Sequence, residues 1–282
     1  MTAKHKTATA LIPAMMIVAA ASAFAQSPDA GMTGGKAFAP EFNAICRSGN
    51  RMSQGCEAIR QREIVDASAS PWRAVGRVNF ASTQVRSHCT GTLISERVVL
   101  TAAHCLYNHP RKSWIPPESI RFVAGYQRGE GVAVSQVERF VLDPVKDTAT
   151  RDFEGGPAQD WALLVLKEPI GRDVGFLETG DLIAAALTGQ PLALAGYAGL
   201  RQHVLAVARD CGAPDIRPQQ GVFLLPCAAM SGDSGAPVLA DMEGTPRVVG
   251  VLSSVAVVDG ESVIIAIPVA RLAKAMEIAS ED

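Results

Sequence analysis

Short hydrophobic runs with a β-type composition dominate the chain from Ile64 onward. Glycine, proline, asparagine or aspartate separates one run from the next, and the runs are rich in valine, leucine and isoleucine. This pattern predicts short strands joined by turns, and it favours barrels or a sandwich over a parallel sheet. We expect an all-β fold with strands at Ala74–Phe80, Thr90–Ile94, Val98–Ala102, Ile120–Val123, Val132–Val141, Trp161–Leu166, Pro191–Ala195, Val204–Ala208, Val222–Leu225, Pro237–Leu239, Val248–Ser253 and Val263–Ile267.

The hydrophobic period changes after Pro268, where apolar residues recur at helical spacing. Proline is common in the first turn of a helix, so a short amphipathic helix is expected over residues 269–279. The less regular stretch Lys167–Gly189 predicts a connection between two halves of the fold. The apolar positions of the expected helix are Val269, Leu272, Ala273 and Met276.

The first residues have the features of an export signal. A basic head from Lys4 to Lys6 precedes the apolar run Leu11–Ala21, and the residues from Ala23 to Ala25 give the small-x-small pattern of a cleavage site. The apolar run is shorter than the ~20 residues that a membrane-spanning helix needs. We expect residues 1–25 to be a signal peptide, with an uncleaved anchor as the alternative. The mature protein should then be secreted or periplasmic, with no stable membrane insertion.

Charge argues against a nucleic-acid partner. The chain carries 26 basic and 28 acidic side chains, and removal of the signal removes two lysines and no acid. A mildly acidic chain without a basic stripe has no electrostatic reason to bind nucleic acid.

Six cysteines in an exported chain predict disulfides. No two of them have CxxC spacing, so neither a zinc site nor a redox motif is expected. Spacing alone leaves the connectivity open. Pairing of neighbours along the chain is our working hypothesis: Cys46–Cys56, Cys89–Cys105 and Cys211–Cys227.

Three local sequences carry the candidate chemistry. His104 ends one apolar run, Asp160 begins another, and Ser234 lies in a tight turn between Gly232 and Gly235. A serine hydroxyl needs a base within hydrogen-bond reach, and imidazole titrates near neutral pH. A carboxylate on the other ring nitrogen fixes the tautomer. The pattern predicts Ser234 as nucleophile, His104 as base and Asp160 as its partner.

Two alternatives fit the sequence less well. Asp152 is a second candidate for the acid, but it lies in a loop with no apolar strand behind it. The order His–Asp–Ser also differs from the Ser–Asp–His order of α/β-hydrolases. We expect His88, His109 and His203 to lie on the surface or in turns.

The segments Thr101–Cys105, Asp160–Leu164 and Gly232–Gly235 resemble three signatures of the chymotrypsin-like (trypsin-like) serine proteases: Thr-Ala-Ala-His-Cys, Asp-x-Ala-Leu-Leu and Gly-Asp-Ser-Gly. The resemblance covers about Ile64 to Ile278, and the part after Leu192 is similar to bacterial members such as glutamyl endopeptidases. It implies a peptidase domain over residues 64–279. Two antiparallel β-barrels, at about residues 64–170 and 180–268, would hold the active site between them.

The resemblance also implies an activity. We expect a serine endopeptidase that cleaves proteins or peptides through an acyl-enzyme, acts as a monomer and needs no cofactor or metal. The N–H groups of Gly232 and Ser234 would form the oxyanion hole, and Cys89–Cys105 would staple the loop of His104. The rival hypothesis is a non-catalytic binding or regulatory module on the same fold.

By the same resemblance, Ala228 lies at the base of the primary specificity pocket, and Ser253, Ser254 and Val255 form one wall. Ala228 cannot supply the acid on which a preference for lysine or arginine depends. Glutamyl endopeptidases carry a histidine just before the first serine of this wall, and here Leu252 occupies that position. We therefore expect a small or medium aliphatic side chain before the scissile bond.

Residues 26–63 are predicted to lack regular structure, as a pro-segment or an N-terminal extension. Ile64 resembles the mature amino terminus of the family, whose α-amine pairs with the acid before the nucleophile, here Asp233. A zymogen cut at Glu63–Ile64 follows from that resemblance. The sequence departs from the pattern at Asp66-Ala67, and the alternative is an extension that stays attached.

Overall fold

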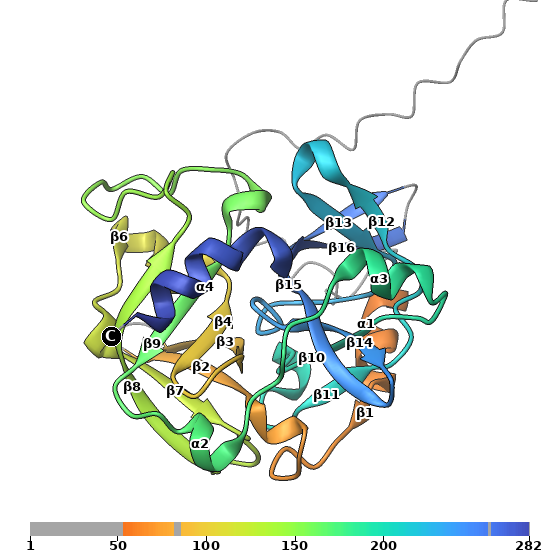
Figure 1. Ribbon diagram of the computed structural model, residues 1–282, viewed down its shortest axis with the longest axis horizontal. Helices are drawn as coiled ribbons and strands as arrows, with labels where there is room; N and C mark the ends of the chain where they lie inside the picture. Colours follow the sequence, from red (N-terminus) through yellow and green to blue (C-terminus); the bar gives the residue numbers. More distant parts are fainter. Residues whose placement is uncertain (1–52, 82–85, 259–260, 282) are drawn as a thin grey trace, which may run out of the picture. The chain divides into compact units, whose positions relative to one another are not determined.

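Strand pairing divides the described chain into a closed barrel and a second antiparallel sheet (Figure 1). This computed structural model describes residues 53–81, 86–258 and 261–281. The expected signal peptide and Cys46 lie outside these residues. No helix within the described ranges is long and apolar enough to cross a membrane.

The barrel is built from the first half of the chain. Its six strands are joined in the order β2-β3-β4-β9-β8-β7. Alternation sets its inside: in β7, Ile120, Phe122 and Ala124 are buried, while Arg121 is exposed. The bounds are β2 (Val75–Ala81), β3 (Arg86–Leu93), β4 (Val98–Thr101), β7 (Ile120–Ala124), β8 (Ala133–Leu142) and β9 (Ala162–Leu166).

The second half forms an eight-stranded antiparallel sheet, whose outer strands are β1 and β12. Its order is β1-β11-β10-β14-β15-β16-β13-β12. The prediction of an all-β fold is confirmed. The part of the chain that was predicted to form the second barrel forms this sheet. The bounds are β1 (Glu63–Ile64), β10 (Ala193–Gly196), β11 (Ala206–Ala208), β12 (Asp215–Arg217), β13 (Val222–Leu225), β14 (Pro237–Met242), β15 (Thr245–Val258) and β16 (Glu261–Pro268).

Each predicted strand corresponds to an observed one, because each is a buried apolar run between turn residues. The prediction missed the shortest strands, β1, β12, β5 (Tyr107–Asn108) and β6 (Ser113–Trp114). It also shortened the hairpin of β15 and β16: residues 254–258 of β15 continue the strand but are only partly buried or exposed.

The helices are short, and two predictions about them need correction. Residues 53–61 form helix α1 rather than an irregular segment, and Cys56 and Ile59 on it are buried. The stretch Lys167–Gly189 holds two helices, one of them capped by the Asp181 side chain. The expected C-terminal helix is present and packs on β8 and β9. The bounds are α1 (Ser53–Gln61), α2 (Gly171–Val174), α3 (Leu182–Leu187) and α4 (Ala273–Ser280), with 3₁₀ turns at Trp72–Ala74, Ala103–Leu106, His109–Arg111, Pro117–Ser119, Pro157–Gln159, Gly199–Arg201, Pro218–Gln220 and Val269–Leu272.

Candidate active site

The pairing of two buried strands places His104 beside Asp160. β4 and β9 run antiparallel with Thr101 opposite Ala162, and every residue of both strands is buried. His104 follows β4 in the 3₁₀ turn Ala103–Leu106, whereas Asp160 comes just before β9. Because antiparallel pairing sets the end of one strand beside the start of its neighbour, both side chains reach the same edge of the barrel.

Asp160 is fully buried, and both of its carboxylate oxygens accept hydrogen bonds. Oδ1 accepts the backbone N–H of His104 at 2.8 Å, and Oδ2 lies 2.8 Å from Nδ1 of the His104 ring. A carboxylate in this position favours the tautomer that carries its proton on Nδ1. Nε2 is then the basic nitrogen of the ring.

A third group contacts the same carboxylate. The hydroxyl of Ser253 donates to Oδ2 of Asp160 at 2.7 Å. The pairing of β15 with β16 shifts register between Leu252 and Ser254, and a bulge of this kind re-aims the extra side chain. The sequence predicted Ser253 as part of a wall of the specificity pocket. In the structure its hydroxyl is a hydrogen-bond donor to Asp160.

The turn of Ser234 is tied to both halves of the fold. The Ser234 carbonyl accepts the N–H of Thr90 on β3 at 2.9 Å, and the Gly235 N–H donates to Leu252 O on β15 at 2.9 Å. Gly232 and Gly235 have φ of +97° and +78°, which is the left-handed backbone expected of this turn. A Cβ on Gly235 would lie 2.4 Å from Thr90 O, so only glycine allows this close approach.

A cavity of about 320 Å³ brings the candidate groups together. His104, Gly232 and Ser234 line it, and so do His88 and His109. Burial is the main cause that lowers the pKa of both His88 and His109 below the ordinary value. The two rings are therefore neutral near pH 7.

Comparison with known proteins identifies the family. A family model of trypsin matches residues 61–207, just over half of the chain. This chain belongs to the trypsin family. The matched residues include His104 and Asp160, and Ser234 lies beyond them.

Individual relatives are distant. Serine protease 23 of Bos taurus is 30% identical over 220 residues, which are 70% of this chain and 56% of that protein. A glutamyl endopeptidase of Bacillus licheniformis is 26% identical over 139 residues, or 48% of this chain and 39% of that one. The chain spans about half the length of the curated relatives it matches.

Solved structures agree on the fold. A Glu endopeptidase in complex with MPD has a TM-score of 0.61 at 20% identity and covers 78% of this chain and 97% of its own. The protease Anisep of Arthrobacter nicotinovorans has a TM-score of 0.53 at 18% identity, with 71% and 92% covered. At such identities the likeness shows a chymotrypsin-like fold.

The expected activation pair takes a different form in this trypsin-family chain. Asp233 is fully buried, and its carboxylate bonds the guanidinium of Arg62 at 2.8 Å rather than an amine at Ile64. Ile64 is part of the uncut chain in β1, and it is 52% exposed. The pair of Asp233 with an α-amine at Ile64 belongs to a chain cut at Glu63–Ile64 and stays a prediction for that form, whereas in the intact chain Arg62 is the partner.

None of the residues expected to form the specificity pocket lines the cavity described above. Ala228 and Val255 pack against the apolar cluster formed by Ile59 of α1, Ala198 and Met230. Ser254 is half-buried on β15. Ala228 also presents its carbonyl to Arg62, at 2.7 Å.

Two of the predicted disulfides lie within the described residues. Cys89 bonds Cys105, next to His104, and Cys211 bonds Cys227. The side-chain ligand atoms of Cys89, His104 and Cys105 lie within 4.8 Å of one another, but the two sulfurs are joined in the disulfide and are not thiolates. That group is therefore a poor metal site.

Thr90 is a site residue that sequence reasoning missed. Its hydroxyl donates to Gly232 O at 2.7 Å and accepts the N–H of Tyr197 at 3.1 Å. Nearby, His88 lines the cavity, and its Nε2 lies 2.9 Å from Tyr197 O. The only signal for Thr90 in the sequence was its position on the same strand as His88 and Cys89.

Proposed function

We propose that this trypsin-family chain is an exported serine endopeptidase, with Ser234 as nucleophile, His104 as base and Asp160 as its partner. The observation that carries the proposal is the buried contact between Asp160 and Nδ1 of His104, on the cavity that Ser234 also lines. Disulfides in the described part of the chain fit an oxidising compartment outside the cytoplasm.

The reaction follows from the positions of these groups. The Ser234 oxygen forms a bond to the substrate carbonyl carbon while its proton passes to Nε2 of His104. The C–N bond then breaks as Nε2 returns the proton to the leaving amine. Water repeats the sequence on the acyl-enzyme, which releases the acid and restores the serine. The N–H groups of Gly232 and Ser234 are the donors for the oxyanion.

The proposed preference for the substrate side chain before the scissile bond rests on two uncharged residues, Ala228 and Val255. Ala228 and Val255 carry no charge, and they pack beside Ile59. Neither residue lines the cavity of Ser234 in the uncut chain, so what supports a small or medium aliphatic side chain before the scissile bond is their size and lack of charge. They offer no basic group for an acidic substrate side chain.

Digestion of a synthetic peptide library, read by mass spectrometry, tests the activity and the preference together. We expect cuts at internal bonds after alanine, valine or leucine. A folded, exported sample that cuts no peptide would favour the non-catalytic binding module instead.

The Ser253 contact predicts a change in turnover rather than in binding. Ser253→Ala removes one donor from the Asp160 carboxylate and should lower kcat about 10- to 100-fold, with KM nearly unchanged, because a hydrogen bond to a buried charge contributes about 1.5–3 kcal/mol. Ser254→Ala, which changes the adjacent serine, is the control and should leave kcat close to that of the parent. A rise in KM without a fall in kcat would return Ser253 to a pocket-wall role.

The Cys89–Cys105 bridge should support activity as well as stability. The double variant Cys89→Ser/Cys105→Ser loses a bridge between residues 16 apart and should lower the free energy of unfolding by about 3 kcal/mol. It should also lower kcat, because Cys105 follows His104. Cys211→Ser/Cys227→Ser, with the same separation, should lower stability similarly and kcat less. Equal kcat losses below both melting temperatures would contradict this role.

A further inference from the structure

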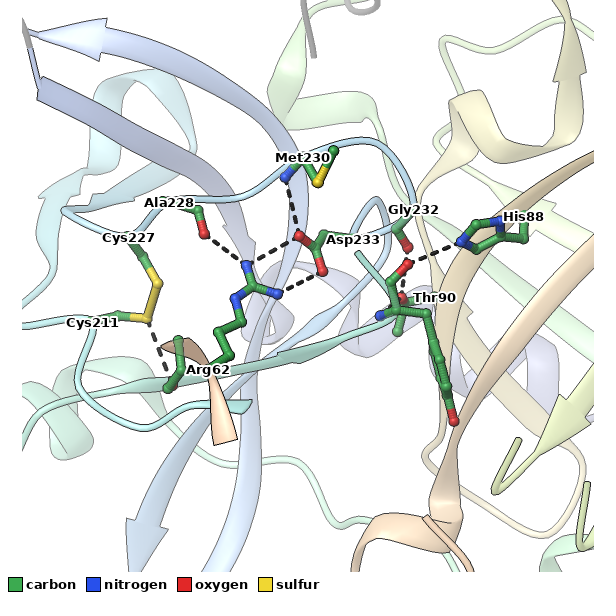
Figure 2. A network of polar contacts seen from close by, with 11 residues as sticks. Arg62, His88, Thr90, Cys211, Cys227, Ala228, Met230, Gly232 and Asp233 are labelled. Carbon is green, nitrogen blue, oxygen red and sulfur yellow. Dashed lines mark hydrogen bonds and ion pairs between the residues drawn. A yellow bond between two sulfur atoms is a disulfide. The ribbon is translucent and has the colours of Figure 1, made fainter. Parts of the chain in front are cut away.

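The most buried charges outside the triad are Arg62 and Asp233. Their side chains are 1% and 0% exposed, and two hydrogen bonds of 2.8 and 3.1 Å join them. The guanidinium also donates to Ala228 O at 2.7 Å, and Asp233 Oδ2 accepts the N–H of Met230 at 3.1 Å. Figure 2 shows the arginine entering beside Ala228 and meeting the carboxylate.

Arg62 comes from the segment before the expected cut, and that segment is anchored on both sides. Ile59 of α1 is fully buried against Ala198 and Met230. Beyond Arg62, Glu63 and Ile64 pair with β11.

Side chains from the body of the fold hold the same segment. Arg201 donates to the carbonyl of Arg62 at 3.1 Å and also to that of Arg60. Glu63 forms an ion pair with Arg209. Residues 59–64 are thus built into the fold of the uncut chain.

Asp233 sits between the two residues whose N–H groups would bind the oxyanion, Gly232 and Ser234. On the far side of the turn, Thr90 holds the Gly232 carbonyl (Figure 2). Removing one partner from a buried ion pair leaves an uncompensated charge, which the structure must move to solvate. Movement of Asp233 would carry the oxyanion donors with it.

We propose that Arg62 is the permanent counter-charge of Asp233 and holds the turn of Gly232 and Ser234 in its oxyanion-binding geometry, so that the chain is active without a cut at Glu63–Ile64. This inference rests on the proposed function. Arg62 acts as a positioning residue. A cut after Glu63 would free the segment that carries it.

Alkaline pH separates this arrangement from one that uses an α-amine. A free α-amine loses its proton near pH 8 (about 7.7–8.0), and a carboxylate partner raises the pKa of the amine above that value, whereas a guanidinium stays charged to about pH 12 or higher. The titratable neighbours are His88 on β3, Arg201, Tyr197, and the Glu63–Arg209 ion pair. Burial lowers the pKa of His88 and raises that of Tyr197, and the hydrogen bond from Arg209 lowers the pKa of Glu63. With the pKa values displaced in these directions, His88, Tyr197 and Glu63 keep their charge states between about pH 7.5 and 10.

The test compares the full chain with Arg62→Gln, Arg62→Lys and Arg60→Gln. Arg60 is the matched control, because it lies in the last turn of α1, two residues before Arg62, and its side chain is 57% exposed. Arg62→Gln should lower kcat about 10²- to 10³-fold, the effect of losing one oxyanion donor, with a much smaller change in KM. Arg60→Gln should match the parent. At pH 7, Arg62→Lys should have a kcat much closer to that of the parent than Arg62→Gln has. This kcat should fall as the buried lysine amine deprotonates, near or below about pH 10.

Two outcomes would overturn the inference: an Arg62→Gln enzyme with the parent's kcat, or an Arg62→Lys enzyme with the parent's alkaline profile. If Arg62→Gln does not fold, the Arg62→Lys profile decides. The parent chain provides an independent test. It is labelled with a fluorophosphonate, its disulfides are reduced, and the mass of the labelled chain is measured by mass spectrometry. A labelled chain that still contains Arg62 supports the inference, and one that always begins at Ile64 contradicts it. A folded parent that neither labels nor hydrolyses peptides refutes the proposed function instead.

Discussion

Replacing Ser234 with alanine should lower kcat about 10⁶-fold, the size of effect seen when the nucleophile of a serine protease is removed. Only the hydroxyl is lost, from a side chain that is 1% exposed, so the melting temperature should stay close to that of the parent. The residual rate would come from the oxyanion donors and substrate binding. Progress curves on a fluorogenic peptide, with kcat measured separately from KM, provide the test.

Non-additivity makes that prediction sharper. Ser234 and His104 act on one proton, so Ser234→Ala/His104→Ala should be no slower than either single variant. Losses that multiply in the double variant would mean that the two groups act independently, against the proposed mechanism.

Asp160→Asn should lower kcat about 10⁴-fold, as the corresponding change does in a chymotrypsin-type protease. Asparagine keeps the shape of the side chain but can donate toward Nδ1 of His104, which favours the wrong tautomer. The amide also loses part of its match to the two donors, the His104 N–H and the Ser253 hydroxyl. The measurement is kcat near neutral pH, with circular dichroism to confirm that the variant folds.

Asp152→Asn is the matched control for that experiment. Asp152 was the other candidate acid, and it is exposed in the loop before the 3₁₀ turn Pro157–Gln159. We expect its kcat to equal that of the parent. A large loss at Asp152 with none at Asp160 would reverse the assignment of the acid.

The strands and the three candidate catalytic residues could be predicted because each is encoded locally. His104 and Asp160 are attached to apolar runs, and antiparallel pairing of those runs brings the two residues together. Ser234 lies in a turn that its glycines mark. Short-range pattern was therefore enough to predict the strands and to propose the three residues.

What the sequence did not reveal depends on contacts between distant residues. Arg62 and Asp233 are 171 positions apart, and a single arginine before an apolar run gives no sign of burial. The contact of Ser253 with Asp160 depends on a one-residue bulge, which no residue type marks. Helix α1 was missed because its apolar face is narrow: among residues 56–61, Cys56 and Ile59 are buried.

Covalent labelling of the full chain by a fluorophosphonate, followed by peptide mapping, tests the central claim most directly. An activated serine of a hydrolase reacts with this probe, whereas an ordinary hydroxyl does not. We predict a single adduct on the peptide that contains Ser234, which disappears in His104→Ala. A folded, exported sample that takes up no label, or takes it up at another residue, would contradict the account.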